Sequence, residues 1–325
     1  MSAQATTTPV ATAPKVPRGE RHLMENEKVL GPLLLAPAII YILALVGFPL
    51  ILAILYAFSS ATAGDPRIDS FDDFVGLKNF RQVLNDGVFT KALRNTVVFT
   101  LVSQAIVIVL SNILAQILLA DFPGKKIFRF LVMLPWTTPI ALSVLGWFWI
   151  FDSVYSPIDW LMREMNLLGP GTTFGPARNM FWLGETELAR GAVIMIHVWR
   201  TLPLATIILL GGLTSIPQDI TEAAEIDGAG FWRKLFYIRL PLLLPILAIA
   251  MLFSMIFTFT DLSVSLVLTR GGPVNDTQVL SSWAYFKGIQ GGNLAQGAAV
   301  ALFMLPVLIA IAIGMLRLAR RGAND

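Results

Sequence analysis

The sequence predicts an all-α integral membrane protein that crosses the bilayer six times. Of its 325 residues, 55% are hydrophobic and only 14% are charged, which is more apolar than a soluble surface tolerates. Six apolar stretches are long enough to cross about 30 Å of hydrocarbon at about 1.5 Å per residue. They are residues 30–58, 96–120, 128–151, 192–213, 242–267 and 294–316.

Polar segments separate these stretches. Residues 1–29 are rich in Ala, Thr and Pro and are therefore expected to form a flexible tail. A cleaved signal peptide is not expected, because the apolar run that follows is far longer than the hydrophobic region of such a peptide. Phe71, Phe74 and Phe80 lie among charges and predict a short amphipathic helix on the outer face. The expected division is a tail at 1–29, a first span at 30–58, an outer loop at 59–95, a five-span core at 96–316 and a tail at 317–325.

Lysine and arginine predict the orientation. Counted over alternate polar segments, one side of the membrane holds 13 Lys and Arg in 76 residues and the other holds 9 in 97. The richer side should be cytoplasmic, which places both termini and residues 213–240 in the cytoplasm. The tight turn Asp121–Lys126 is expected to make spans two and three a hairpin. The outer loop 152–187 could meet a partner or cap an entrance.

Several classes of site are not supported by the composition. The chain has no cysteine, which excludes disulfides and thiolate metal sites. Its two histidines, His22 and His197, are far apart in sequence, so we expect no metal and no cofactor, and no Ser-His-Asp set lies at membrane depth. The net charge of +3 is small and diffuse, which fits membrane orientation better than nucleic-acid binding.

One stretch, residues 215–241, interrupts the apolar pattern with short helical pieces. Its sequence is SIPQDITEAAEIDGAGFWRKLFYIRLP. Pro217 suits the first position of a helix, and Gly228 suits a left-handed C-terminal cap. A second helix is expected to restart at Phe231 and to run into span five. This stretch is either a docking surface or an amphipathic segment that rests on lipid headgroups.

The residues EAAEIDGAGFWRKLFYIRLPLL resemble the EAA signature of ABC transporter permeases. That signature is an EAA triplet, a later Gly and an Ile-x-Leu-Pro element, and the IDGA at Ile226–Ala229 fits its carbohydrate-type members. In this family the segment is a coupling helix that sits in a cleft of a cytoplasmic ATPase subunit. The resemblance therefore implies a cytoplasmic coupling helix between spans four and five. The implied ATPase-coupling residues are Glu222, Ala223, Ala224, Asp227 and Gly228.

Two other segments are similar to the same family. LRNTVVFT, at Leu93–Thr100, resembles the start of the family's core domain, and Phe259–Ile289 resembles the outer part of the sugar-permease pattern. Gly271, Gly272 and Pro273 match an element typical of one of the two permeases in heterodimeric sugar importers. The resemblance thus implies a second permease subunit of a different sequence and an extracytoplasmic binding protein that docks on this loop. Leu262-Ser263 replaces an aromatic-rich stretch, which leaves the substrate open.

The chain lacks a nucleotide-binding loop of its own. Its Gly124-Lys125 pair has no preceding Gly at the spacing that a phosphate-binding loop requires. ATP must then be hydrolysed elsewhere, by two separate cytoplasmic ATPase subunits. We expect this chain to be a non-catalytic translocation subunit.

Polar residues inside spans are costly and are therefore candidates for function. Ser254, Thr258, Asp261 and Ser265 recur at helical spacing on span five and are predicted to line a substrate path. Phe253, Phe257 or Phe259 could stack on a sugar face. The alternative is that the hydroxyls bond their own helix and that Asp261 lies near the outer surface in contact with water.

Other polar and aromatic residues of the spans are interpreted as structural. His197 and Arg200 share a face of span four and could serve a translocation path or bind another helix; we favour a structural role for both, since a proton relay would need more acids than Asp261. Trp136, Trp147 and Trp149 are read as packing or interfacial aromatics, and Asn112 as a contact between helices.

The function predicted from these observations is that of a permease subunit of an ATP-driven ABC importer in a bacterial or archaeal cytoplasmic membrane. The cargo is expected to be a carbohydrate, either a sugar or a polyol. Three alternatives stay open: import of glycerol phosphate or another small solute, an assembly or anchoring protein, and a secondary transporter. A secondary transporter would need paired ionisable residues or inverted repeats inside the spans, and neither is evident in the sequence.

Overall fold

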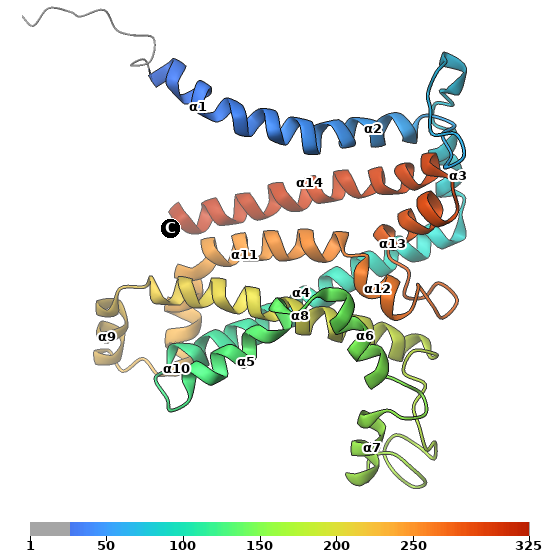
Figure 1. The fold of residues 1–325 in the computed structure, drawn as a ribbon. Helices are drawn as coiled ribbons and strands as arrows, with labels where there is room; N and C mark the ends of the chain where they lie inside the picture. The colour runs from blue at the N-terminus through green and yellow to red at the C-terminus, as the bar shows by residue number, and fades with distance from the viewer. Residues whose placement is uncertain (1–26, 325) are drawn as a thin grey trace, which may run out of the picture. The chain divides into compact units, whose positions relative to one another are not determined.

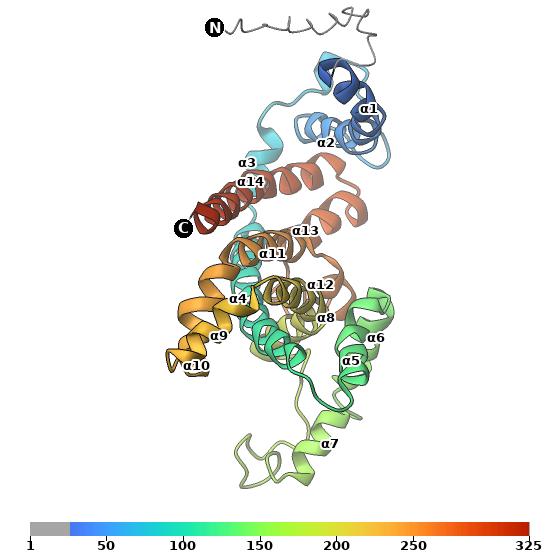
Figure 2. The ribbon, with the colours of Figure 1, turned by 90° about the vertical axis from the view of Figure 1, so that its left-hand side faces the viewer.

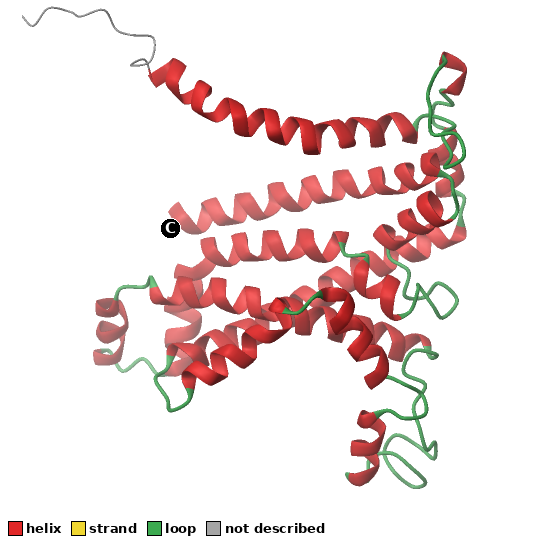
Figure 3. Ribbon diagram, viewed as in Figure 1, coloured by secondary structure: helices red, strands yellow, loops and turns green. Residues whose placement is uncertain are grey.

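The computed structural model describes residues 27–324, and this part of the chain is almost entirely helical (Figures 1 and 3). Most of the predicted tail, residues 1–26, lies outside the described residues. Within them, five helices are long and apolar enough to cross a membrane, and a bent pair makes six if it counts as one span. The predicted fold class, an all-helical membrane protein, is confirmed.

The chain divides into two compact units, residues 1–52 and residues 53–325. The described part of the first unit is helical: α1 (Glu27–Ile42) continues through a π-helical turn at Leu43–Gly47 into α2 (Phe48–Ala57), whose last residues belong to the second unit. Leu30–Ala57 is a candidate span and agrees with the predicted first span.

The second unit holds the remaining helices. They are α3 (Lys78–Leu84), α4 (Gly87–Leu119), α5 (Lys125–Thr137), α6 (Ile140–Ile150), α7 (Pro157–Glu164), α8 (Thr186–Thr214), α9 (Gln218–Ile226), α10 (Phe231–Lys234), α11 (Leu240–Thr260), α12 (Ser263–Leu268), α13 (Leu280–Tyr285) and α14 (Leu294–Asn324). The outer-loop helix that the sequence predicts is present only in part, because α3 contains Phe80, whereas Phe71 lies in a short 3-10 turn and Phe74 is extended. A π-helical segment, Leu235–Arg239, joins α10 to α11, and a second one, Phe286–Gln290, follows α13.

The long helices of this unit lie side by side. Helix α4 packs against α8, and α11 packs against α8 and α14. The C-terminal end of α14 lies at the same end of the unit as α9 and α10 (Figures 1 and 2). An apolar cluster at that end joins α4, α8 and α11 through Leu118, Leu209 and Leu243. At the opposite end, a second cluster joins α6, α8 and α12, and a third packs α14 against α4 and α11.

The third apolar stretch is not the straight span that the sequence predicts. It is divided into α5 and α6, which meet at an angle of 99°. The cause is Pro139, which has no N–H to donate and which pushes Thr138 into the extended conformation that its φ of −76° and ψ of 138° describe. The Thr138 hydroxyl donates to the carbonyl oxygens of Leu134 and Pro135, at 3.0 and 2.9 Å. The Pro135 carbonyl, which loses its helical donor because Pro139 has no N–H, thereby finds another partner.

The fifth apolar stretch is also interrupted. Residues Phe231–Leu268 form one candidate span, as the sequence predicts over 242–267, but the helix is broken within it, because α11 ends at Thr260 and α12 begins at Ser263. Asp261 lies at this break, where its Oδ1 accepts a hydrogen bond from the backbone N–H of Ser263, the first residue of α12, at 2.8 Å.

Close backbone contact holds α14 to the segment that precedes it. A β-carbon added to Gly297 would collide with the backbone of Gly288 and would lie 2.9 Å from the Ala284 carbonyl oxygen. Gly314, on the same helix, has nothing within 4 Å of such an atom.

We therefore expect Gly297→Ala to destabilise the protein by about 1–3 kcal/mol, because the two backbones must separate. Gly314→Ala is the matched control and should be neutral or stabilising by up to about 1 kcal/mol, as alanine favours helix. Thermal unfolding of the purified chain in detergent measures both. Equal unfolding midpoints for the two variants would contradict the close contact.

Candidate functional site

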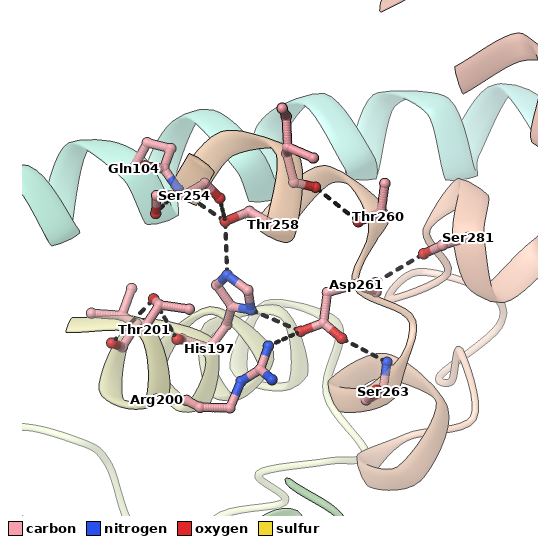
Figure 4. Close-up of polar contacts among 12 residues, drawn as sticks. Gln104, His197, Arg200, Thr201, Ser254, Thr258, Thr260, Asp261, Ser263 and Ser281 are labelled. Carbon is pink, nitrogen blue, oxygen red and sulfur yellow. Dashed lines mark hydrogen bonds and ion pairs between the residues drawn. The ribbon is translucent and has the colours of Figure 1, made fainter. Parts of the chain in front are cut away.

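A buried polar cluster lies where α4, α8 and α11 meet (Figure 4). Thr258 is at its centre, and its hydroxyl accepts a hydrogen bond from Gln104 Nε2 at 2.8 Å and lies 2.8 Å from His197 Nε2. Gln104 Nε2 also donates to the Ser254 hydroxyl, at 2.9 Å. Side chains from three helices thus share one hydrogen-bonded network inside the bundle.

Asp261 connects this network to the break between α11 and α12. Its Oδ2 accepts hydrogen bonds from Arg200 Nη2 at 2.6 Å and from His197 Nδ1 at 3.0 Å. Its side chain is only 5% exposed, so the carboxylate depends on these partners to stay charged. The backbone carbonyl of Asp261 accepts from the Ser281 hydroxyl at 2.8 Å, which adds α13 to the assembly.

The alternative reading of span five is half right, and two expectations about this region are wrong. The Thr258 hydroxyl does donate to its own helix, to the Ser254 carbonyl at 2.7 Å, but the Asp261 side chain is buried and ion-paired rather than in contact with water. The pairing of Arg200 and His197 with Asp261 also contradicts the expectation that no ionisable residues pair inside the spans. Phe259 is only 2% exposed and is not available to stack on a substrate.

The proposed helical stripe is only partly retained. Ser254, Thr258 and Asp261 do come together, but Ser265 lies on α12, beyond the break, and its hydroxyl donates to the Thr277 carbonyl at 2.7 Å. Phe253 and Phe257, which are about half exposed, remain available on the surface of α11.

Additional polar groups on α4 face the same interior. Within the part of the chain that the structure describes, Gln104 Oε1 and the hydroxyls of Thr100 and Ser103 are buried without a hydrogen-bond partner. Ser254 borders two small cavities of about 10 Å³ each, and Trp136 and Phe257 line one of them. Buried groups of this kind bind water or the hydroxyls of a ligand. The sequence analysis did not single out Gln104, although its position in an apolar stretch was a signal.

The stretch that interrupts the apolar pattern folds as the sequence predicts. Helix α9 follows Pro217 and ends before Gly228, whose φ is +74°. Glu222, Ala223, Asp227 and Gly228 are exposed, whereas Ala224 is buried. Ile226 projects from the end of α9 and is 87% exposed.

Two polar contacts fix the chain after α9. Lys234 Nζ donates to Glu225 Oε1 at 2.6 Å, and this hydrogen bond and the lysine charge lower the pKa of Glu225. Arg239 donates to Gln116 near the end of α4. Helix α9 is therefore linked through α10 to the spans.

The loop 269–280 is held at the opposite end of the unit. Gly271 has a φ of +82°, and a β-carbon there would collide with the Gln278 side chain, so the loop requires glycine at this position. Asp276 accepts hydrogen bonds from Thr186 at 2.9 Å and Lys91 at 3.2 Å. The Thr186 hydroxyl and the Lys91 ammonium lower the pKa of Asp276, so both ties are fully present at neutral pH.

Metal binding has no support among residues 27–324. No three His, Asp or Glu side chains in this range lie close enough together to bind an ion, and His22 lies outside it.

Comparison with known proteins decides the family. Residues 107–323 match the family described as binding-protein-dependent transport system inner membrane component. The chain belongs to this family of ABC transporter permeases. The trehalose/maltose transport system permease of Thermococcus litoralis is 30% identical over 92% of this chain and 96% of its own length. A probable ABC transporter permease of Brucella suis is 29% identical over 93% of this chain and 100% of its own length.

A solved structure shares the fold of this permease. One chain of a bacterial alginate ABC transporter, crystallised with an alginate pentasaccharide-bound periplasmic protein, aligns with a TM-score of 0.74 and 20% identity. The alignment covers 93% of this permease and 98% of that chain. The family resemblance read from the EAA segment and the assignment as a non-catalytic transport subunit are confirmed.

The Asp261–Arg200 pair can be tested by a double-mutant cycle. Asp261→Ala leaves a guanidinium buried without its carboxylate and should cost about 3–5 kcal/mol of unfolding free energy. Combining it with Arg200→Met removes both charges, so the double variant should lose much less than the sum of the single losses. Chemical unfolding in detergent gives the four stabilities.

An exposed pair provides the control for this cycle. Arg67 Nε lies 3.1 Å from Asp65 Oδ1, and both side chains are largely exposed. Asp65→Ala should change stability by no more than about 1 kcal/mol. Additive losses at Arg200 and Asp261 would contradict the mutual dependence described above.

Proposed function

We propose that this permease imports a carbohydrate, either a sugar or a polyol, which an extracytoplasmic binding protein delivers. The main support is the full-length similarity to a permease named for trehalose and maltose. The alginate transporter, whose permease shares the fold, supports the same class of cargo. The hydroxyl, amide and carboxylate groups around Thr258 are suitable partners for sugar hydroxyls.

ATP is proposed to act through α9 from two separate cytoplasmic ATPase subunits. Glu222, Ala223, Ala224, Asp227 and Gly228 would form or shape the contact, with the small Ala223 allowing close approach. Helical structure runs on from Phe231 through α10 and α11 to Thr260, so a displacement at α9 reaches Asp261 along one helical path. Closure of the ATPase subunits would thereby shift α11 against α8 and open the membrane subunits outward.

The substrate path is proposed to run beside α11. Ser254, Thr258 and Asp261 would support or line it, and the half-exposed Phe253 and Phe257 would contact the sugar. The bend between α5 and α6 supports this location, because broken helix at membrane depth is tolerated only inside protein or beside a water-filled cavity. Trp136, next to the bend, shares a small cavity with Phe257.

The remaining proposed partners are a second permease and an extracytoplasmic binding protein. A second permease, of different sequence, would complete the path across the membrane. The Gly271, Gly272 and Pro273 loop is proposed to receive the binding protein, since its ties to α4 and α8 would carry that contact into the spans. The distribution of Lys and Arg favours cytoplasmic termini.

The other candidate functions have less support. Import of glycerol phosphate would need a cation that is free to bind the phosphate, but Asp261 neutralises Arg200, the cation of the cluster. The hypothesis of a secondary transporter is not retained, because the chain belongs to the ABC permease family.

The coupling role predicts the effect of Glu222→Lys. Charge reversal on the exposed face of α9 should abolish ATP-dependent sugar uptake into vesicles that carry the full complex and should release the ATPase subunits during purification. Glu164→Lys, on α7, is the control and should leave the ATPase subunits bound. Retained uptake and retained ATPase in the Glu222 variant would reject α9 as the docking surface.

The path role predicts the reactivity of Ser254→Cys. Because the chain contains no cysteine, one introduced thiol can be followed alone. A small, charged thiol reagent should modify position 254 during ATP-driven turnover, and a transported sugar should slow the reaction. Ala115→Cys, buried between α4 and α8, should stay unmodified. A thiol at 254 that never reacts would place the path elsewhere.

A further inference from the structure

Helix α7 turns an apolar face away from the rest of the protein. Trp160 and Leu161, and Met165 directly after the helix, are 57%, 52% and 60% exposed, and the one charged side chain at helical spacing among them is the exposed Glu164. Tyr155, just before the helix, is 86% exposed. A short amphipathic helix in water would bury such side chains, so this face requires an apolar partner.

Hydrogen bonds on the polar side of α7 fix the direction in which its apolar side points. Asp159 is buried, and its carboxylate accepts hydrogen bonds from the Met180 backbone N–H at 2.9 Å and from Trp182 Nε1 at 2.8 Å. Arg163 Nη1 donates to the Arg178 carbonyl at 2.8 Å and to Asn179 Oδ1 at 2.9 Å. Because these bonds hold the polar side against residues 178–182, the helix cannot roll to hide its apolar side.

The position of α7 is fixed relative to a membrane helix. The Ser156 hydroxyl, at the N-cap of α7, donates to the carbonyl of Ile150 at 2.8 Å, and Ile150 is the last residue of α6. Helix α7 lies crosswise to the long helices (Figure 1). Trp149, near the end of α6, is also an exposed aromatic residue, at 76%.

We propose that α7 is an interfacial helix that rests on the bilayer surface opposite α9, with Trp160, Leu161 and Met165 immersed among headgroups and upper acyl chains. Three observations favour lipid as the occupant. Helix α7 is tied to membrane helix α6 by the Ser156–Ile150 hydrogen bond, and it lies crosswise to the spans. Its exposed side chains include tryptophan and tyrosine, which concentrate at the membrane–water boundary. The outer loop 152–187 would then be supported by the membrane beside the spans.

Spin labels test this proposal directly. Leu161→Cys and Met165→Cys each place a single label on the apolar face, and Ala177→Cys places one on the exposed loop as the aqueous control. The complete transport complex is reconstituted in vesicles of phosphatidylethanolamine and phosphatidylglycerol. Collision with oxygen, which concentrates in lipid, is compared with collision with a water-soluble nickel chelate.

Lipid contact predicts strong oxygen collisions and several-fold weaker nickel collisions at 161 and 165 than at 177. Nickel collisions as strong as those at 177 would overturn the proposal, because the face would be in water. Weak collisions with both reagents would also overturn it, because a protein partner would cover the face. The labels report their surroundings whether or not the vesicles take up a sugar, so this result is independent of the proposed cargo.

Discussion

The burial of one carboxylate constrains the arrangement of the spans. The Asp261 side chain is only 5% exposed, and its charge is compatible with that burial only while Arg200 and His197 face it. Both partners come from α8, whereas Asp261 lies between α11 and α12. Sliding of α11 along α8 would separate the charges, so the shift proposed for α11 would have to turn about this point or replace these partners with others.

The same cluster lies between the two surfaces at which we propose that other subunits act. From one end, α10 and α11 lead from α9 to Thr260, next to Asp261. From the other end, Ser281 binds the Asp261 carbonyl, and Asp276 in the preceding loop is tied to α4 and α8. A binding protein at the loop and an ATPase at α9 would therefore influence one shared set of hydrogen bonds, which is a physical basis for coupling delivery to hydrolysis.

The sequence predicts the parts of this structure that local chemistry determines. Pro217 and Gly228 mark both ends of α9, because proline and glycine restrict the backbone in known ways. The bend at Pro139 was not predictable by the same rule, since Pro203, Pro245 and Pro306 lie inside continuous helices. What distinguishes Pro139 is the pair of threonines before it and the packing of α5 on α8 and α6 on α12.

The polar cluster was predicted only in part for a related reason. Helical spacing on one segment brings Ser254, Thr258 and Asp261 together, and the structure retains that proximity. Spacing cannot show that Asp261 meets Arg200, 61 positions earlier, because that contact depends on how α8 crosses α11.

The bend between α5 and α6 has a mechanical consequence. Helix α5 packs on α8 and α6 packs on α12, so the corner at Pro139 connects α8 to α12. Because α12 begins two residues after Asp261, a displacement of α12 would be passed through this corner to α5 and so to α8.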